Sequence, residues 1–354
     1  MKATLLTLLG ILWPVTFLVE IDQLPLNQIQ IIGSHNSYKQ AIEPALFQTL
    51  KKADSSLANH IDYSHLSLED QLNMGLLNLE IDIYADSQGG KYSHPKGLDW
   101  AKQTAPYDPK EEMKEPGFKV FHIQEIDFRS HCLTFKNCLQ TLKSWSDTHK
   151  GHYPIFITIN TKDETINKPG FTVPEKFTAE VFDQLDKVLV ETLGRDKLLI
   201  PDDIRGNHKT LEEAVKKKNW PKVQKAKGKF IFILDETGAK RASYIQNHSS
   251  LKGRILFTNS DADTPEAAIL IKNNPERDFA EIQKLVKQGY IVRTRADSDT
   301  EEARHNDYSH FTKAQQSGAQ IITTDYYVPS THFKSDYQIS FKDKKYIRVN
   351  SVKP

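Results

Sequence analysis

Two histidines stand at or beside short apolar runs of the sequence. His35 follows the run at residues 30–33, and His122 lies in the run at residues 118–123. If both runs are parallel strands of one sheet, their carboxyl ends meet at the edge where α/β barrels build active sites. Two histidines there can serve as general base and general acid, because imidazole titrates near neutral pH. We interpret the other histidines of the chain as structural or surface residues.

Two carboxylates lie within another apolar run, at residues 76–84. Glu80 and Asp82 are two residues apart, so on a strand both side chains point to the same face. An unpaired carboxylate in an apolar setting is costly, and a hard cation is the simplest compensation. The alternative is that both carboxylates pair with arginine or lysine inside the fold.

Amide and amine side chains complete this set. Asn36 follows His35 directly, and Asn160 ends the run at residues 153–160. Two carboxylates and two amide oxygens, completed by water or substrate, favour Ca²⁺ over Zn²⁺. Lys162, just beyond the same run, can hold a phosphate oxygen as a point charge. The alternative for Lys162 is an ordinary surface lysine.

These residues need a scaffold that brings distant runs of the chain together. We expect eight strands, most of them nearly continuous in apolar residues, as in a parallel sheet that is buried on both faces. The expected strands are residues 30–33, 76–84, 118–123, 153–160, 229–236, 254–259, 290–295 and 320–325. Helical patterns begin at residue 67 and cover residues 133–148, 174–193, 210–218, 275–287 and 300–317.

The alternation of strands and helices predicts an α/β fold. We expect a (β/α)₈ TIM barrel, with one irregular member allowed, as a single domain over residues 21–354. An open doubly wound sheet is the alternative, but no glycine-rich phosphate loop follows the first strand.

Composition excludes several classes of protein. Of the 354 residues, 38% are hydrophobic and 26% are charged, which suffices for a large core and excludes general disorder. Lys and Arg number 47 against 46 Asp and Glu, so no bulk positive charge recruits nucleic acid. Two cysteines are too few for a disulfide-framework fold or a multi-cysteine zinc site.

The N-terminal residues 1–20 predict export. A basic start precedes an uncharged run at residues 3–19, interrupted by Pro14, which is typical of a secretory signal peptide. A retained membrane anchor is the alternative, because the run is near the lower length limit for spanning a bilayer. We therefore expect a secreted or periplasmic protein. In that case Cys132 and Cys138 form a local disulfide; two buried thiols on one short helix are the alternative.

The motifs together resemble a known family. GSHNSY, LEIDI, FHI, YPIFITIN with its following TK, and the C-terminal stretch GYIVRTRADSDTEEARHNDYSHFTKAQQSGAQIITTDYY are similar to phosphoinositide-specific phospholipases C. The closer similarity is to the calcium-dependent, secreted group of bacteria and fungi. The resemblance extends roughly from Ile31 to Tyr327, and the combination of motifs is specific although each alone is weak.

The resemblance implies roles for individual residues. His35 and His122 stand at the family's two catalytic histidine positions. Asn36, Glu80 and Asp82 stand at its calcium-ligand positions.

Two further positions connect the chain to related enzymes. Asn160 stands where members of the eukaryotic type carry a fourth ligand, a glutamate, so one negative charge is missing here. Lys162 matches a strand-4 lysine of the related glycerophosphodiesterases.

The implied reaction cleaves the phosphodiester between diacylglycerol and inositol phosphate in a phospholipid at a membrane surface. The inositol 2-hydroxyl attacks phosphorus, and the two histidines transfer protons. A glycerophosphodiester phosphodiesterase is an alternative, although the first catalytic histidine of that class is normally followed by arginine, whereas His35 is followed by Asn36. A non-catalytic inositide-binding protein and a sphingomyelin-type phosphodiesterase are further alternatives. We predict no protein partner.

Overall fold

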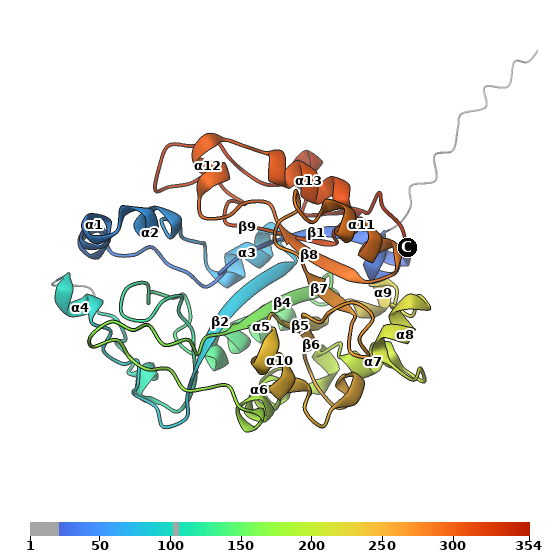
Figure 1. The fold of residues 1–354 in the computed structure, drawn as a ribbon, viewed down its shortest axis with the longest axis horizontal. Helices are drawn as coiled ribbons and strands as arrows, with labels where there is room; N and C mark the ends of the chain where they lie inside the picture. Colours follow the sequence, from blue (N-terminus) through green and yellow to red (C-terminus); the bar gives the residue numbers. More distant parts are fainter. Residues whose placement is uncertain (1–20, 102–105) are drawn as a thin grey trace, which may run out of the picture.

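The computed structural model describes residues 21–101 and 106–354 (Figure 1). The signal peptide or anchor predicted for residues 1–20 lies outside the described residues. Among the residues that are described, no helix combines the length and the apolar character needed to cross a bilayer.

The described strands form two five-stranded sheets. The first has the order β10-β1-β9-β8-β7 and the second the order β3-β2-β4-β5-β6. The strands are β1 (Ile29–Ser34), β2 (Asn78–Asp86), β3 (Gly117–Lys119), β4 (Ile155–Thr161), β5 (Phe230–Leu234), β6 (Phe257–Thr258), β7 (Ile269–Ile271), β8 (Ile291–Arg295), β9 (Ile321–Thr324) and β10 (Ile347–Val349). All neighbours pair in parallel except β3 with β2 and β10 with β1.

The two sheets meet at two seams. At the β1–β2 seam, the Leu77 amide donates to the Ile32 carbonyl at 3.1 Å. At the β6–β7 seam, Asn259 and Ile269 form an isolated parallel bridge. The eight parallel strands therefore form the ring of an irregular (β/α)₈ barrel, which confirms the predicted fold class.

One expected barrel strand was wrong. Of residues 118–123, only the first two belong to a strand, β3, which runs antiparallel to the end of β2 as an appendage to the barrel. The position in the ring belongs to β7, which the sequence analysis missed because its three residues are too short to show a period. The strand expected at residues 254–259 shrinks to the two residues of β6.

Helices cover the outside of the strands. In the view of Figure 1, α6, α7 and α10 lie below the strands, and α11, α12 and α13 lie above them. The helices are α1 (Pro44–Ala53), α2 (Ser55–His60), α3 (Leu68–Met74), α4 (Gly97–Trp100), α5 (Phe135–Thr148), α6 (Ala179–Leu193), α7 (Pro201–Arg205), α8 (Leu211–Lys216), α9 (Val223–Ala226), α10 (Gly238–Ile245), α11 (Phe279–Lys287), α12 (Glu301–His305) and α13 (Ser309–Ser317). Short 3-10 helices are Ile21–Gln23, Leu26–Gln28, Glu112–Lys114, Arg195–Lys197, Ser249–Leu251 and Lys342–Lys344.

Local sequence signals explain where several helices begin. Thr134, Thr178 and Thr210 each accept a backbone N–H with the side chain at the start of α5, α6 and α8. The helix expected over residues 300–317 is two helices, because Asn306 adopts a left-handed conformation that ends α12.

Candidate active site

His35 lies directly after β1 and contacts a carboxylate at the end of β9. Its amide donates to the Thr324 carbonyl at 3.1 Å, and its Nδ1 lies 2.9 Å from Asp325 Oδ1. Arg295, at the end of β8, places Nη2 3.3 Å from the other oxygen of Asp325. Burial raises the pKa of Asp325, but the charges of His35 and Arg295 outweigh burial and hold that pKa well below its usual range. Asp325 is therefore an anion that orients His35.

His122 has a carboxylate partner of its own, within one tight loop. The His122 amide donates to the Asp127 carbonyl at 3.2 Å, and its Nδ1 lies 2.8 Å from Asp127 Oδ2. The Tyr84 hydroxyl, on β2, donates to the His122 carbonyl at 3.0 Å. This hydrogen bond ties the loop to a barrel strand.

A buried lysine connects the two histidine loops. The Lys39 amide donates to the Asn36 carbonyl at 2.9 Å, which fixes Lys39 in the turn after β1. Its ammonium lies 3.3 Å from Asp127 Oδ2, and both side chains are fully buried. The loop that carries His122 is thereby held against the loop that carries His35.

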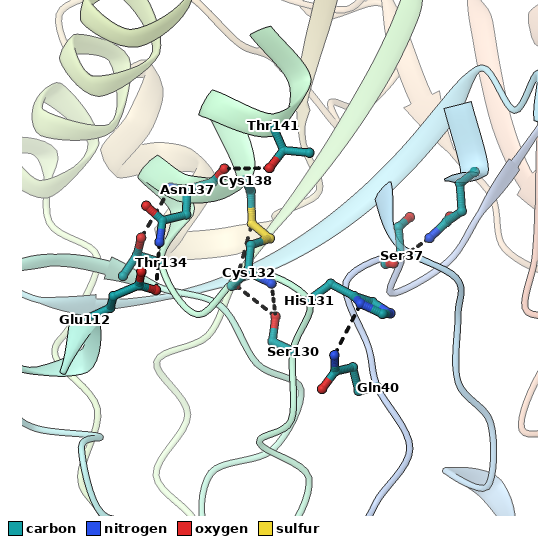
Figure 2. Close-up of a disulfide and its surroundings, with 11 residues drawn as sticks. Ser37, Gln40, Glu112, Ser130, His131, Cys132, Thr134, Asn137, Cys138 and Thr141 are labelled. Atoms are coloured by element: carbon teal, nitrogen blue, oxygen red, sulfur yellow. Dashed lines mark hydrogen bonds between the residues drawn. A yellow bond between two sulfur atoms is a disulfide. The ribbon is translucent and has the colours of Figure 1, made fainter. Parts of the chain in front are cut away.

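The disulfide Cys132–Cys138 anchors the far end of the His122 segment (Figure 2). It joins the chain before α5 to the first turn of that helix, with a Cα–Cα distance of 5.3 Å. Beside it, the His131 amide donates to the Tyr38 carbonyl at 2.8 Å, and Gln40 contacts the His131 ring (Figure 2). The predicted disulfide is confirmed, and its neighbours contact the His35 loop.

Glu80 points into the barrel and contacts two basic groups. One oxygen lies 3.6 Å from His35 Nε2, and the other accepts a hydrogen bond from the guanidinium of Arg293 on β8. Burial opposes ionisation of Glu80, but Arg293 and His35 outweigh it and lower the pKa of this carboxyl. Glu80 is thus an anion in the site.

Asp82 lies two residues further along β2, on the same face. It is fully buried, and its closest partner among the described contacts is Lys162. Lys162 Nζ lies 3.0 Å from Asp82 Oδ2 as an ion pair. Burial lowers the pKa of Lys162, yet Asp82 and Glu80 outweigh burial and raise it.

The two asparagines lie on either side of these carboxylates. Asn160 pairs with Asp82 in the parallel register of β2 and β4, so both side chains are on the same face. Asn36 is buried, adopts a φ of 45°, and donates its amide N–H to the Tyr63 hydroxyl at 2.7 Å. Its amide oxygen is the atom that remains for a cation.

The described contacts give a mixed result for the predicted set. His35 contacts Glu80, and Asp82 contacts Lys162 and lies beside Asn160, whereas His122 is linked to His35 only through Asp127 and Lys39. Among the residues that are described, no three His, Cys, Asp or Glu side chains form a metal-binding group. A cation at this mouth would therefore need amide oxygens in addition to the two carboxylates.

Several residues of the site escaped the sequence analysis. They are the partners that orient or neutralise the predicted residues: Lys39, Asp127, Arg293, Arg295 and Asp325. Arg295 and Asp325 end two expected strands, so the strand-end rule used for the first four strands would have found them. Asp127 carried no such signal, because it follows no barrel strand.

Comparison with known proteins gives a family match and solved structures of similar fold. A family model described as phosphoinositide phospholipase C, Ca²⁺-dependent, matches residues 24–351. No curated protein matches the chain.

Solved structures show the same fold. A calcium-dependent phosphoinositol-specific phospholipase C from Pseudomonas sp. has a TM-score of 0.55 at 15% identity, over 93% of this chain and 96% of that one. A Ca²⁺-dependent phosphatidylinositol-specific phospholipase C from Streptomyces antibioticus has a TM-score of 0.54 at 18% identity, over 89% of this chain and 99% of that one.

Proposed function

The chain belongs to the Ca²⁺-dependent phosphoinositide phospholipase C family, and from this premise we propose the substrate, the products and the roles of its residues. The family makes it a calcium-dependent phosphodiesterase. The proposed substrate is a phosphatidylinositol-type lipid at a membrane surface. The proposed products are diacylglycerol and an inositol phosphate, cyclic or acyclic.

One observation carries the proposal. Two histidines each contact a buried carboxylate, Asp325 or Asp127, and His35 also lies beside Glu80. A carboxylate can only accept a hydrogen bond, so we assign a hydrogen to Nδ1 of each ring. Nε2 of His35 and Nε2 of His122 are then the atoms that exchange protons with substrate.

The reaction divides between these two rings. One Nε2 removes the proton from the inositol 2-hydroxyl as its oxygen attacks phosphorus. The other ring starts as an imidazolium, with a proton on Nε2 as well as on Nδ1, and gives the Nε2 proton to the glycerol oxygen as the bond from that oxygen to phosphorus breaks. Because the nucleophile belongs to the substrate, holding the inositol ring in place supplies proximity. Asp325 and Asp127 stabilise the imidazolium form of their rings, which the base reaches after its proton transfer and the acid holds before its own.

The oxygen donors at the mouth fit a calcium ion. Asn36, Glu80, Asp82 and Asn160 would hold it. Two buried carboxylates on one face of β2, with Asn160 beside Asp82 on the neighbouring strand, support this assignment. When bound, the ion supplies a lower pKa for the attacking hydroxyl and neutralises charge on the phosphoryl group. Lys162 and Arg293 already neutralise the two carboxylates, so they compete with a cation and can also contact the phosphate.

Phosphorus NMR of the products tests the proposal. We expect phosphatidylinositol to give cyclic or acyclic inositol phosphate with calcium and none in excess chelator. Changing His35 or His122 to Ala should lower the maximal rate by roughly 10²–10⁴-fold. Glycerophosphoinositol and sphingomyelin serve as comparison substrates. Faster cleavage of either, or tight lipid binding without turnover, would refute the proposed function.

A further inference from the structure

A chain of three side chains lies on the rim, outside the site described above. The Ser64 hydroxyl lies 2.8 Å from His332 Nε2. On the other side of the same ring, Nδ1 lies 2.8 Å from Asp62 Oδ1. This is the hydrogen-bond order of a nucleophile, a base and an orienting carboxylate.

The hydrogen-bond roles in this chain follow from the chemistry of the carboxylate. Asp62 accepts from the His332 Nδ1–H, so Nε2 carries the lone pair that faces the Ser64 hydroxyl. Arg304 Nη2 donates to the second oxygen of Asp62 at 3.0 Å. Burial raises the pKa of Asp62, but the hydrogen bonds from His332 and Arg304 outweigh it and lower that pKa. Asp62 is therefore a fixed anion behind the ring.

The ring and the carboxylate are sheltered but reachable. The side chains of His332 and Asp62 are 18% and 14% exposed, and Ser64 is half-buried. The loop that carries His332 is fixed by Ser330, whose hydroxyl accepts the amide N–H of His332 at 3.1 Å. The three side chains are therefore held in place without being closed off from solvent.

A groove of mixed character adjoins the His332 end of this chain. It has a volume of about 410 Å³, and Asp62 and His332, but not Ser64, are among the residues that line it. Its other lining residues are the apolar Ala41, Ile42, Pro44, Phe47 and Ile61 and the polar Gln48, Lys51 and Thr331. Tyr63 and His65, which flank Ser64, face Asn36 and Asp325 instead. Because the side chains of Tyr63 and His65 point to the phosphodiesterase mouth, Asp62 and Ser64, which alternate with them along the chain, lie apart from that mouth.

We propose that Ser64, His332 and Asp62 form a second, serine-dependent site that takes carboxylic esters with an apolar acyl group. The Ser64 Oγ forms a bond to the carbonyl carbon as its proton passes to His332 Nε2. The C–O bond to the alcohol then breaks, and the alcohol leaves with that proton. Water hydrolyses the acyl-serine by the same route and restores the hydroxyl. The apolar residues of the groove, such as Ile42 and Phe47, contact the acyl chain.

The chain supplies a matched control within α2. The Ser56 hydroxyl lies 3.5 Å from His60 Nε2, and this pair has no carboxylate partner among the described contacts. A serine that reacts only because a histidine is near should behave alike at both positions. A serine that reacts because an oriented base activates it should react at Ser64 alone.

The test is labelling with a fluorophosphonate, which forms an Oγ–P bond with loss of fluoride, followed by peptide mass spectrometry. We expect label on Ser64, none on Ser56, loss of label in Ser64→Ala, and no change in Ser56→Ala. Asp62→Asn and His332→Gln should each slow labelling at least tenfold. Hydrolysis of p-nitrophenyl butyrate should fall in the same variants.

The readout involves neither calcium nor a phosphodiester, so its failure is distinguishable from failure of the proposed function. Because His332 also joins two segments, circular dichroism must show that each variant is folded. Ser64→Ala keeps the His332–Asp62 pair and remains informative if His332→Gln unfolds. Absence of label on Ser64, equal label on Ser56, or an undiminished rate in folded Asp62→Asn would overturn the proposal.

Discussion

His35 and His122 are held in place by different parts of the fold. His35 is placed by a barrel strand and held by Asp325 from a neighbouring strand end. His122 is placed by a loop that depends on Asp127, Lys39 and a hydrogen bond from β2. At the scale of single residues, the orientation of each histidine ring therefore depends on its carboxylate partner, Asp325 for His35 and Asp127 for His122.

Asn160 tests the proposed calcium site. An amide oxygen can bind Ca²⁺ but brings no charge, and the number of charged ligands helps to set affinity. We expect Asn160→Glu to tighten calcium binding and Asn160→Ala to weaken it, as measured by calorimetric titration of the three proteins. The turnover rate of Asn160→Glu can fall even though its calcium affinity rises, because an added negative charge weakens the effect of the cation on the pKa of the substrate hydroxyl. Equal affinities would remove Asn160 from the ligand set.

Asp297 lies behind the His35–Asp325 pair and gives the fold a pH dependence. Its carboxylate accepts the Asp325 amide N–H at 2.8 Å and contacts the Tyr337 hydroxyl at 3.4 Å. Burial, followed by the charge of Asp325, raises its pKa to about 7. The folded state thus binds this proton more tightly than the unfolded chain, in which an aspartate has a pKa of about 3.9.

The expected stability contribution is complete below about pH 3.9 and is lost as the pH rises through about 7. Asp297→Asn removes this titration, so the difference in urea midpoint between pH 5 and pH 8 should be smaller than in the unchanged protein. Asp325 cannot cause the same slope, because its lowered pKa confines its own effect to more acidic pH. An identical pH slope in the variant would show that Asp297 is ionised throughout this range.

At the scale of elements, the disulfide matters because it holds a segment rather than a side chain. Cys132 and Cys138 join the end of the His122 segment to α5, and both are buried. We expect the double change to Ala to lower stability by about 2–3 kcal/mol, since the cross-link restricts the unfolded chain. Urea unfolding measures this loss.

The burial of the disulfide also predicts how it responds to reductants. Because both sulfurs are shielded, a thiol reductant under native conditions should leave the bond intact, whereas the same reductant in urea should release two thiols. Thiol titration in the two conditions is the check. Rapid reduction of the native protein would show that the segment opens readily, which would weaken the view that it is a rigid support for His122.

At the scale of the whole molecule, the barrel depends on a close approach at the β1–β2 seam. A Cβ at Gly33 would lie 2.3 Å from the Asn78 carbonyl oxygen and 2.4 Å from its Cβ. Both atoms belong to a buried strand that cannot yield easily. We expect Gly33→Ala to destabilise the protein by about 3 kcal/mol or more, because overpacking here would separate the two sheets.

A second glycine separates this clash from simple backbone strain. Gly151 has a φ of 77°, but a Cβ there would meet nothing within 4 Å. Gly151→Ala should cost only about 1 kcal/mol, the penalty for an alanine in a left-handed conformation. Thermal unfolding of both variants, followed by circular dichroism, measures the difference. If the two substitutions lower the stability equally, the close approach at the seam is not the reason that residue 33 must be glycine.

Much of the fold was predictable because a buried parallel strand is apolar along its whole length. The strands around Ile81, Ile157 and Phe232 followed from that rule alone. So did the position of His35 directly after β1 and that of Glu80 and Asp82 on one face of β2. The helix expected from residue 133 begins after its cap Thr134, whereas α6 begins after Thr178 and not at the expected residue 174. These are local signals, and each is complete within about ten residues of sequence.

Only the tertiary structure decided which polar groups meet. Asp325 lies 290 residues from His35, and Arg293 lies 213 residues from Glu80, so no local pattern could pair them. The same holds for His332 with Asp62 and for the replacement of the expected third barrel strand by β7. Which residues are buried can be predicted from the sequence, because burial depends on the chemistry of each residue's own side chain. Charge pairing depends on how the barrel closes, since closure alone sets the distance between strand ends.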